Sequence, residues 1–241
     1  MNLTEFTMWL KSAFVGYDLG DLLPSDAETK LFHLFRRLVE ANRVTNLTAI
    51  TDEKGVILKH FVDSATISRH ISLGSAVIDV GCGAGFPSLP LAILRSDLKI
   101  TALDSTAKKI DCVKCFASEL ELDNVSAVCS RAEEYVRDKR EAFDVCTSRA
   151  VARMNVLSEL CLPFIKVGGS FIAMKSNKAL EEYDEALSGI KKLGGTYANS
   201  FHLSLTLEEE TIEREIYCFS KVASTPQQFP RKYAQIIKKP L

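Results

Sequence analysis

From Ala76 onward, short apolar runs alternate with amphipathic stretches along the chain. A strand, a helix and a second strand in succession form a βαβ unit, so we expect an α/β fold with a mostly parallel sheet. After Leu193 two strands follow without a helix between them, which predicts an antiparallel pair at the end of the sheet. The expected strands are Ala76–Val80, Lys99–Asp104, Val125–Cys129, Phe143–Thr147, Gly169–Met174, Tyr197–Thr206 and Thr211–Ser220, and the expected helices are Pro87–Leu94, Ala107–Leu120, Arg153–Ile165 and Lys178–Leu193.

The two ends of the chain differ from this core. Residues 1–72 are expected to form a helical extension packed on the core, residues 73–221. Within the extension, Ser25 and Glu28 have capping-box spacing before a helix that should run to Ala41. The polar run 42–48 should be a loop, and another helix is expected from about Lys54 to Ile71. Residues 222–241 form a basic tail in which three prolines argue against regular structure.

The composition excludes few classes of function, but it indicates the cellular environment of the protein. Of the residues, 46% are hydrophobic and 25% charged, and no apolar run of 18 residues occurs, so we expect no membrane span. The formal net charge is −1, so any contact with nucleic acid must come from local basic patches. Seven cysteines, an odd number, favour free thiols in a reducing cytoplasm. The pair Cys112 and Cys115 should be ordinary helix residues, and no metal site is expected.

A glycine-rich loop follows the first expected strand. The strand ends at Asp79, and the loop then carries Gly81, Gly83 and Gly85. Glycines allow the backbone to turn tightly and to approach a ligand closely. In open α/β folds such a ligand binds at the carboxyl ends of the strands. We therefore expect a nucleotide-like cofactor above this edge of the sheet.

The spacing indicates which cofactor. A dinucleotide fingerprint, G-x-G-x-x-G, counted from Gly81 requires glycine at position 86, which is Phe86. The pattern found instead, acidic-x-G-x-G-x-G, is typical of proteins that bind S-adenosylmethionine (SAM). SAM carries an ammonium and a sulfonium but no phosphate, so the carboxylate of Asp79 would attract it. A purely structural turn and a site for NAD or another nucleotide remain as alternatives.

Two later segments could complete the cofactor site. Asp104 ends the second strand, 23 residues after Gly81, where an acid can accept hydrogen bonds from both ribose hydroxyls. Ala132 and Glu133 follow the third strand, where residues flank the adenine. For both segments the competing interpretation is a residue that caps the next helix.

Several motifs in order resemble the RsmG (GidB) family of bacterial ribosomal RNA methyltransferases. The resemblance extends from about Leu31 to the C-terminus and implies a class I SAM-dependent methyltransferase, Rossmann-like, with an antiparallel C-terminal strand pair. The tail departs from the family after the Pro-Arg-Lys run, which puts its conformation in doubt. The matching runs are Asn46-Leu47-Thr48, Lys59-His60-Phe61-Val62-Asp63-Ser64, the loop DVGCGAGFPSLPLAI, Leu103-Asp104-Ser105 with Lys108-Lys109, Ser148-Arg149-Ala150-Val151-Ala152-Arg153, Ala173-Met174-Lys175 and Pro230-Arg231-Lys232.

The resemblance also implies a reaction, the methylation of guanine nitrogen-7 in the 530 loop of 16S rRNA. The partner is then 16S rRNA or the small ribosomal subunit, in the cytoplasm, and a monomer is the default expectation. By position, Gly81, Phe86, Ala132, Glu133 and Arg149 are implied to contact SAM. The residues implied to line the active site and position the substrate are Asn46, His60, Arg149 and Lys175.

This chemistry requires no general base. Guanine nitrogen-7 carries an in-plane lone pair, so alignment and proximity matter more than proton transfer. Arg149, after the fourth strand, is the expected substrate-positioning residue, and Lys175 could reach an RNA phosphate. Structural alternatives remain for each: an ion pair for Arg149, a surface charge for Lys175, a packed histidine for His60 and a turn residue for Asn46.

Other functions fit parts of the pattern. A SAM methyltransferase acting on another RNA or on a small molecule would share the loop, as would a SAM-binding regulator without catalysis. A nucleotide-dependent oxidoreductase is disfavoured by Phe86.

Overall fold

One seven-stranded sheet organises the molecule in the computed structural model, which describes residues 1–149, 151–176, 180–208 and 210–241. The strand order is β3-β2-β1-β4-β5-β7-β6; β1 to β5 are parallel, and β7 is antiparallel to both β5 and β6. The expected mostly parallel sheet with an antiparallel C-terminal pair is therefore confirmed. The strands are β1 Ala76–Val80, β2 Lys99–Asp104, β3 Val125–Cys129, β4 Phe143–Arg149, β5 Ile165–Lys175, β6 Gly195–Leu207 and β7 Glu210–Lys221.

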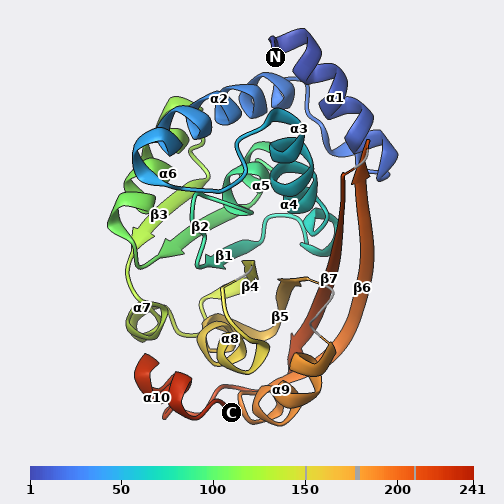
Figure 1. Ribbon diagram of the computed structural model, residues 1–241. Helices are drawn as coiled ribbons and strands as arrows, with labels where there is room; N and C mark the ends of the chain where they lie inside the picture. The colour runs from blue at the N-terminus through green and yellow to red at the C-terminus, as the bar shows by residue number, and fades with distance from the viewer. Residues whose placement is uncertain (150, 177–179, 209) are drawn as a thin grey trace.

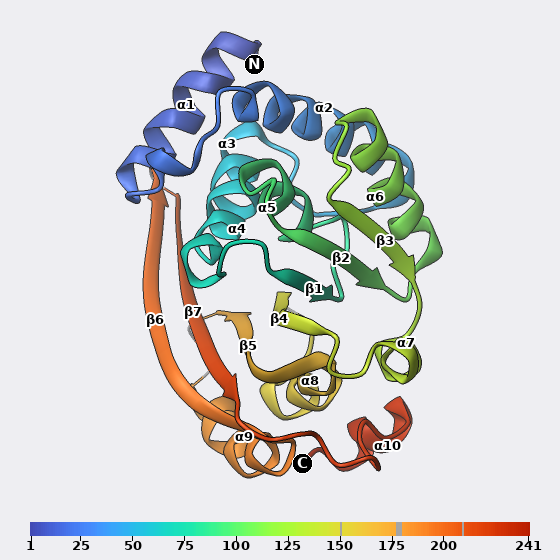
Figure 2. The same cartoon turned by 180° about the vertical axis from the view of Figure 1, so that it is seen from behind.

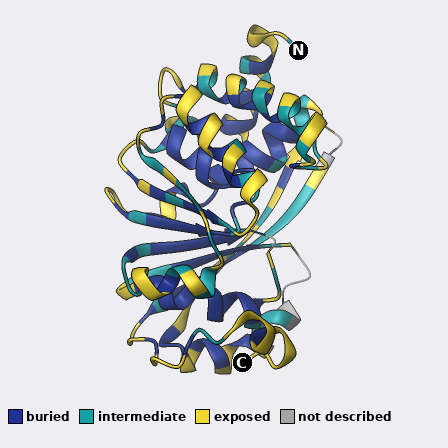
Figure 3. Cartoon of the chain, turned by 90° about the vertical axis from the view of Figure 1, so that its left-hand side faces the viewer, coloured by how far each residue is buried: buried dark blue, intermediate teal, exposed yellow. Residues whose placement is uncertain are grey.

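Helices cover both faces of the sheet (Figure 1, and from behind in Figure 2). On one side lie the N-terminal helices together with α5 and α6, and on the other lie α7 to α10. Successive side chains of a strand point to opposite faces of the sheet. Strand β1 therefore contributes to both hydrophobic clusters: Val77 packs in the cluster on the first side and Ile78 in the cluster on the second. Figure 3 shows the buried sheet between exposed outer helix faces. The longer helices are α1 Leu3–Gly16, α2 Ala27–Thr45, α5 Ser88–Leu94, α6 Ala107–Glu119, α7 Ala132–Lys139, α8 Met154–Cys161, α9 Leu180–Lys192 and α10 Tyr233–Lys238.

One expected helix boundary near the sheet was wrong, and another lies outside the described residues. The helix predicted to reach Ile165 ends at Cys161, and a short 3-10 turn, η4 Leu162–Phe164, follows it. Pro163 has no backbone N–H, so the α-helical ladder cannot continue through it. The first part of the helix predicted to begin at Lys178 lies outside the described residues, and α9 follows from Leu180.

The N-terminal helices also differ from expectation. The capping box predicted at Ser25 and Glu28 is absent: Asp26 is the N-cap of α2, and its side chain makes no capping bond. A capping box does occur at α1, where Asn2 and Glu5 exchange bonds of 3.0 and 3.1 Å. Helix α2 continues past Ala41 to Thr45, so only the end of the predicted loop is irregular.

The helical segment expected between Lys54 and Ile71 is present but changes its winding. It consists of α3 Glu53–Val56, a π-helical turn η2 Ile57–Val62, α4 Asp63–Ala65 and a 3-10 turn η3 Ser68–His70. Before α2 lies a further short 3-10 turn, η1 Gly20–Leu22. Single π turns are frequent at functional sites, and η2 carries Lys59 and His60 toward the carboxyl edge of the sheet.

The prediction that the tail lacks regular structure was wrong. Pro230 and Pro240 leave room between them for one short helix, α10. The tail is also anchored, because Phe229 and Ile236 are buried and Arg231 forms an ion pair with the buried Glu159. The basic tail is thus part of the folded body rather than a free arm.

All seven cysteines are free, and Cys112 and Cys115 lie on α6. Among the described residues, no group of three or more histidine, cysteine or acidic side chains could hold a metal ion. No helix in the described part of the chain has both the length and the apolar character to cross a bilayer.

Candidate active site

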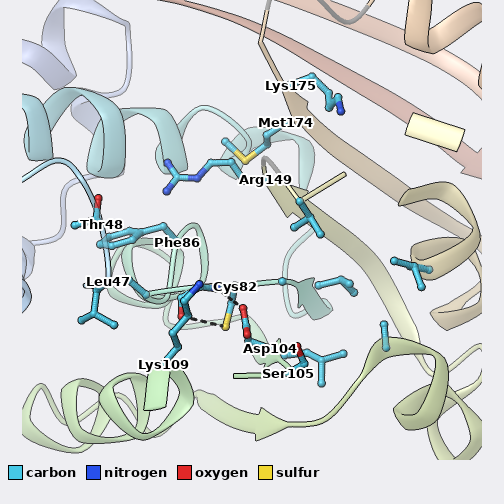
Figure 4. Close-up of a pocket in the computed structure, with 18 of the residues that line it drawn as sticks. Leu47, Thr48, Cys82, Phe86, Asp104, Ser105, Lys109, Arg149, Met174 and Lys175 are labelled. Atoms are coloured by element: carbon cyan, nitrogen blue, oxygen red, sulfur yellow. Dashed lines mark hydrogen bonds between the residues drawn. The ribbon is translucent and has the colours of Figure 1, made fainter. Parts of the chain in front are cut away.

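A pocket of about 710 Å³ opens at the carboxyl ends of the parallel strands. It brings together most of the predicted site residues, although they come from distant segments. Figure 4 shows Phe86 and Arg149 on one side of this pocket and Asp104 with Ser105 on the other. The predicted residues that line it are His60, Gly81, Gly83, Phe86, Asp104, Ala132, Glu133, Arg149 and Lys175.

The glycine loop forms the floor of the pocket. The backbone N–H groups of Gly81 and Cys82 both donate to the carbonyl of Leu103, at 2.8 and 3.0 Å, which ties the loop to β2. Gly81 has a φ of +77°, and a Cβ on it would lie 2.4 Å from Cγ2 of Val151. Only glycine fits both the backbone angle and this close approach.

Gly83 and Gly85 have different roles in the loop. A Cβ on Gly83 would meet no atom within 4 Å, so this residue borders open space. Gly85 does not line the pocket; a Cβ there would lie 2.5 Å from Cδ1 of Leu89, so Gly85 allows α5 to pack against the loop.

Carboxylates border the end of the pocket beside the glycine loop. Asp104 accepts the N–H of Gly83 at 3.0 Å and that of Thr106 at 2.8 Å, which fixes its carboxylate beside the loop. Each carboxylate oxygen can accept a further bond, so Asp104 still has acceptor capacity for a ligand. Ala132 and Glu133 lie in the first turn of α7 and line the same end.

Asp79 lies beneath the loop and does not line the pocket. Its side chain is fully buried, and Oδ2 accepts the hydroxyl of Ser88 at 2.5 Å and the backbone N–H of Ser88 at 3.3 Å. Oδ1 has no hydrogen-bond partner among the described residues. Burial raises the pKa of Asp79 to about 6, against the effect of Ser88 and of Arg149. The residue thus holds a destabilised carboxylate under the predicted cofactor loop.

These residues fit a cationic, phosphate-free nucleoside ligand. Asp79, Asp104 and Glu133 surround the loop with acidic groups, and Asp79 keeps one buried oxygen without a partner. The ammonium and sulfonium of SAM would be attracted by these carboxylates. Gly83 leaves the space above the loop free.

On the opposite side, His60, Phe86 and Arg149 form a packed layer. The His60 ring stacks on Phe86 with centroids 4.3 Å apart and planes at 11°, and the Arg149 guanidinium lies 5.6 Å from the Phe86 centroid. His60 Nε2 contacts Thr48 Oγ1 at 3.1 Å, and Nδ1 lies 3.2 Å from Nη2 of Arg149. Burial, and then the charge of Arg149, lower the pKa of His60 to about 3. His60 is therefore neutral at physiological pH.

Arg149 is held by two residues of the helical segment between α3 and η3. Its Nη1 donates to the Lys59 carbonyl at 2.7 Å and to Asp63 Oδ2 at 2.8 Å. The Lys59 carbonyl belongs to η2, where the π winding departs from the regular i to i−4 ladder.

Lys175 and Asn46 take less direct positions. The Lys175 ammonium donates to the Ala152 carbonyl at 2.7 Å and pairs with Glu182 at 2.6 Å, at the edge of the pocket. Asn46 ends α2 with a left-handed φ of +47° and does not line the pocket; its neighbours Leu47 and Thr48 do. The turn interpretation of Asn46 matches this placement.

Sequence reasoning missed several pocket residues. Thr48 and Lys59 lie within runs that carried the family resemblance, so their position was a usable signal. Arg214 on β7 and Tyr233 on α10 had no such signal, because they depend on a strand register and on a tail helix that were not predicted. The missed residues that line the pocket include Thr48, Lys59, Lys109, Arg214 and Tyr233.

Comparison with known proteins decides the family. A GidB family model, described as rRNA small subunit methyltransferase G, matches residues 27–209. The chain belongs to this family. Ribosomal RNA small subunit methyltransferase G of Staphylococcus saprophyticus is 47% identical over 221 residues, which cover 90% of this chain and 92% of that protein. The corresponding protein of Exiguobacterium sibiricum is 46% identical over 222 residues, 90% of this chain and 92% of its own. As a member of the family, the chain is a methyltransferase.

Solved structures agree on the fold. TYW2 of M. jannaschii, crystallised in complex with AdoMet, has a TM-score of 0.54 at 15% identity and covers 72% of this chain and 80% of its own. At this identity the likeness concerns the architecture alone, which is that of class I methyltransferases.

Proposed function

We propose that the protein transfers the methyl group of SAM to nitrogen-7 of a guanine in the 530 loop of 16S rRNA. The observation that carries this proposal is the pocket itself. It joins a glycine-lined half that contains Asp104 and Glu133 to a half that contains Arg149, Lys175 and the neutral His60. The names of the relatives, which are small-subunit rRNA methyltransferases, support the substrate class.

The glycine-lined half would hold the cofactor. Asp104 would accept hydrogen bonds from the ribose hydroxyls, and Ala132 with Glu133 would border the adenine. Asp79 would compensate positive charge from beneath the loop. SAM, when bound, supplies an electrophilic methyl carbon on its sulfonium.

The arginine-bordered half would receive the guanine. Nitrogen-7 has a free lone pair, so the protein need only align the base with the methyl carbon. His60 suits this role, because a histidine with a pKa of about 3 neither carries charge nor takes up a proton at neutral pH. Arg149, held by Asp63 and by the Lys59 carbonyl, would present guanidinium N–H groups to an oxygen of the substrate.

Access favours an unpaired nucleotide. The major groove of an A-form RNA duplex is deep and narrow, so nitrogen-7 of a paired guanine is difficult to reach. A splayed loop base could enter the pocket. The proposal includes that the protein is a monomer and that it acts on ribosomal particles in the cytoplasm.

Methyl transfer can be measured directly. With SAM carrying a tritiated methyl group, we expect label to enter 16S rRNA in small subunits from cells that lack this protein. Subunits from cells that contain it should accept little label, because their site is already methylated. Absence of transfer to either substrate, with SAM binding intact, would favour a SAM-binding regulator instead.

The remaining alternative is a methyltransferase for another RNA or a small molecule. Label in a different RNA would show that the protein methylates that RNA instead. Label in a small acceptor and in no RNA would show that the substrate is a small molecule. Either result would leave the cofactor assignment in place.

A further inference from the structure

A buried carboxylate beside the pocket, Asp63, binds a second arginine besides Arg149. Asp63 is fully buried at the end of the π turn and lies between two guanidinium groups. Its Oδ2 accepts from Nη1 of Arg149 at 2.8 Å, and its Oδ1 accepts from Nε of Arg214 at 2.8 Å. A second contact, 3.3 Å from Arg214 Nη2 to Oδ2, makes the Arg214 pair bidentate.

The two arginines come from different strands. Arg149 ends β4, whereas Arg214 lies on β7, and both side chains line the pocket. One carboxylate thus fixes two cations from separate parts of the sheet, and the group keeps a net charge of +1 at the pocket wall. That charge would attract an oxygen acceptor of the substrate.

Arg214 retains donors that the protein does not use. A guanidinium has five N–H groups. Among the described residues, Arg214 bonds to Asp63 through Nε and Nη2 and to the Glu213 carbonyl through Nη1, at 3.3 Å. The side chain is 21% exposed, so the remaining N–H groups can meet a ligand in the pocket.

We propose that Arg214 is a substrate-binding residue and that Asp63 is the positioning residue for both Arg214 and Arg149. Together they would bind an oxygen of the target nucleotide, either the guanine carbonyl or a phosphate. The inference rests on the proposed function and extends it to residues outside the predicted site.

The carboxylate of Asp63 would act by fixing the side chains of Arg149 and Arg214 in one conformation. A guanidinium that already holds a bidentate partner has lost its rotamer freedom before the substrate arrives, so binding costs less ordering. A base held in one orientation keeps nitrogen-7 aligned with the methyl carbon. Without Asp63, two neighbouring cations would repel each other and turn away from the pocket wall.

The test compares Arg214→Gln with wild type on small subunits from cells that lack the protein. We expect kcat/KM for the subunit to fall at least tenfold, while the Kd for SAM, measured by calorimetry, stays within twofold. Arg69→Gln is the matched control, since Arg69 pairs with Asp18 and Asp21 outside the pocket. It should leave kcat/KM within twofold.

Salt dependence separates the two sources of the oxygen. If Arg214 binds a phosphate, the slope of log affinity for rRNA against log salt should fall by about one in Arg214→Gln. If it binds the guanine carbonyl, the slope should stay unchanged while kcat/KM falls. Either result supports substrate contact.

Asp63→Asn tests the positioning role separately. It should lower kcat with SAM affinity retained, because Arg149 and Arg214 lose their fixed orientation; should this variant not fold, Arg214→Gln still decides the matter. Arg214→Gln activity within twofold of wild type would overturn the inference, as would an equal loss of SAM affinity and melting temperature, which marks a purely structural pair. Wild-type protein that methylates no rRNA would instead refute the proposed function itself.

Discussion

Replacement of Asp79 by Asn is expected to stabilise the cofactor-free protein at pH 7.5 and to weaken SAM binding at least tenfold. The carboxylate is fully buried, and burial raises its pKa to about 6. Relative to its ordinary value of 3.8, this corresponds to about 3 kcal/mol against the ionised form. The neutral Asn keeps the shape and the acceptor for Ser88 but removes the charge.

The pH dependence follows from the sign of the shift. An acid whose pKa is raised in the folded state stabilises the fold when protonated, and this contribution is lost as the pH rises from about 4 through 6. The stability difference between Asp79→Asn and wild type should therefore grow across that interval and level off above it. The negative charge of Asp79 destabilises the protein without ligand, and the positive charge of bound SAM would compensate it.

Urea unfolding at pH 4.5 and 7.5 and calorimetry with SAM provide the two readouts. Asp97→Asn is the contrasting control, because Arg95 holds the pKa of Asp97 at about 2. That variant should lose stability at pH 7.5 and keep its SAM affinity. An Asp79→Asn protein with unchanged SAM affinity would refute the role of Asp79 in the cofactor site.

Replacement of Arg231 by Ala should destabilise the protein by about 3–5 kcal/mol, the usual cost of leaving a buried charge without its partner. Glu159 is fully buried and accepts three donors from Arg231: the backbone N–H at 2.8 Å, Nε at 2.9 Å and Nη2 at 2.5 Å. The pair fastens the tail to α8. In a chain of this size the melting temperature should fall by on the order of 10 °C.

Arg137→Ala is the matched control, since Arg137 is an exposed arginine on the neighbouring α7. Its melting temperature should change by less than about 2 °C. Equal melting temperatures for Arg231→Ala and wild type would show that the tail contributes little to the folded body.

The basic tail, residues 222–241, presents less positive charge to solvent than its composition indicated. Just before the tail, Lys221 on β7 is buried and donates to the Leu162 carbonyl and to Thr225; within the tail, Arg231 is paired with Glu159. Lys232, Lys238 and Lys239 remain exposed. Charge alone could not distinguish these two groups, because burial depends on tertiary contacts that the sequence does not display.

What the sequence predicted well has a local physical cause. The strand and helix alternation follows from periodic burial, and the predicted end of the second strand at Asp104, beside the glycine loop, is confirmed. The loop requires glycine at Gly81 for a positive φ, and the run of three glycines after the strand is visible in the sequence.

What it missed depends on packing between distant segments. Asp63 meets Arg214 across 151 positions, and Arg214 reaches the pocket from β7, whose pairing with β5 the sequence does not display. The capping interpretation of Ser25 failed because Asp26 occupies the N-cap position of α2. Tail helix α10 arises between two prolines, where composition favoured an irregular chain.

The most direct test of the central claim is mass-spectrometric nucleoside mapping of 16S rRNA from cells that lack this protein. We expect 7-methylguanosine to disappear from one position in the 530 loop and to return when the wild-type protein is restored. An unchanged methylation pattern in the deleted strain would contradict the proposed reaction.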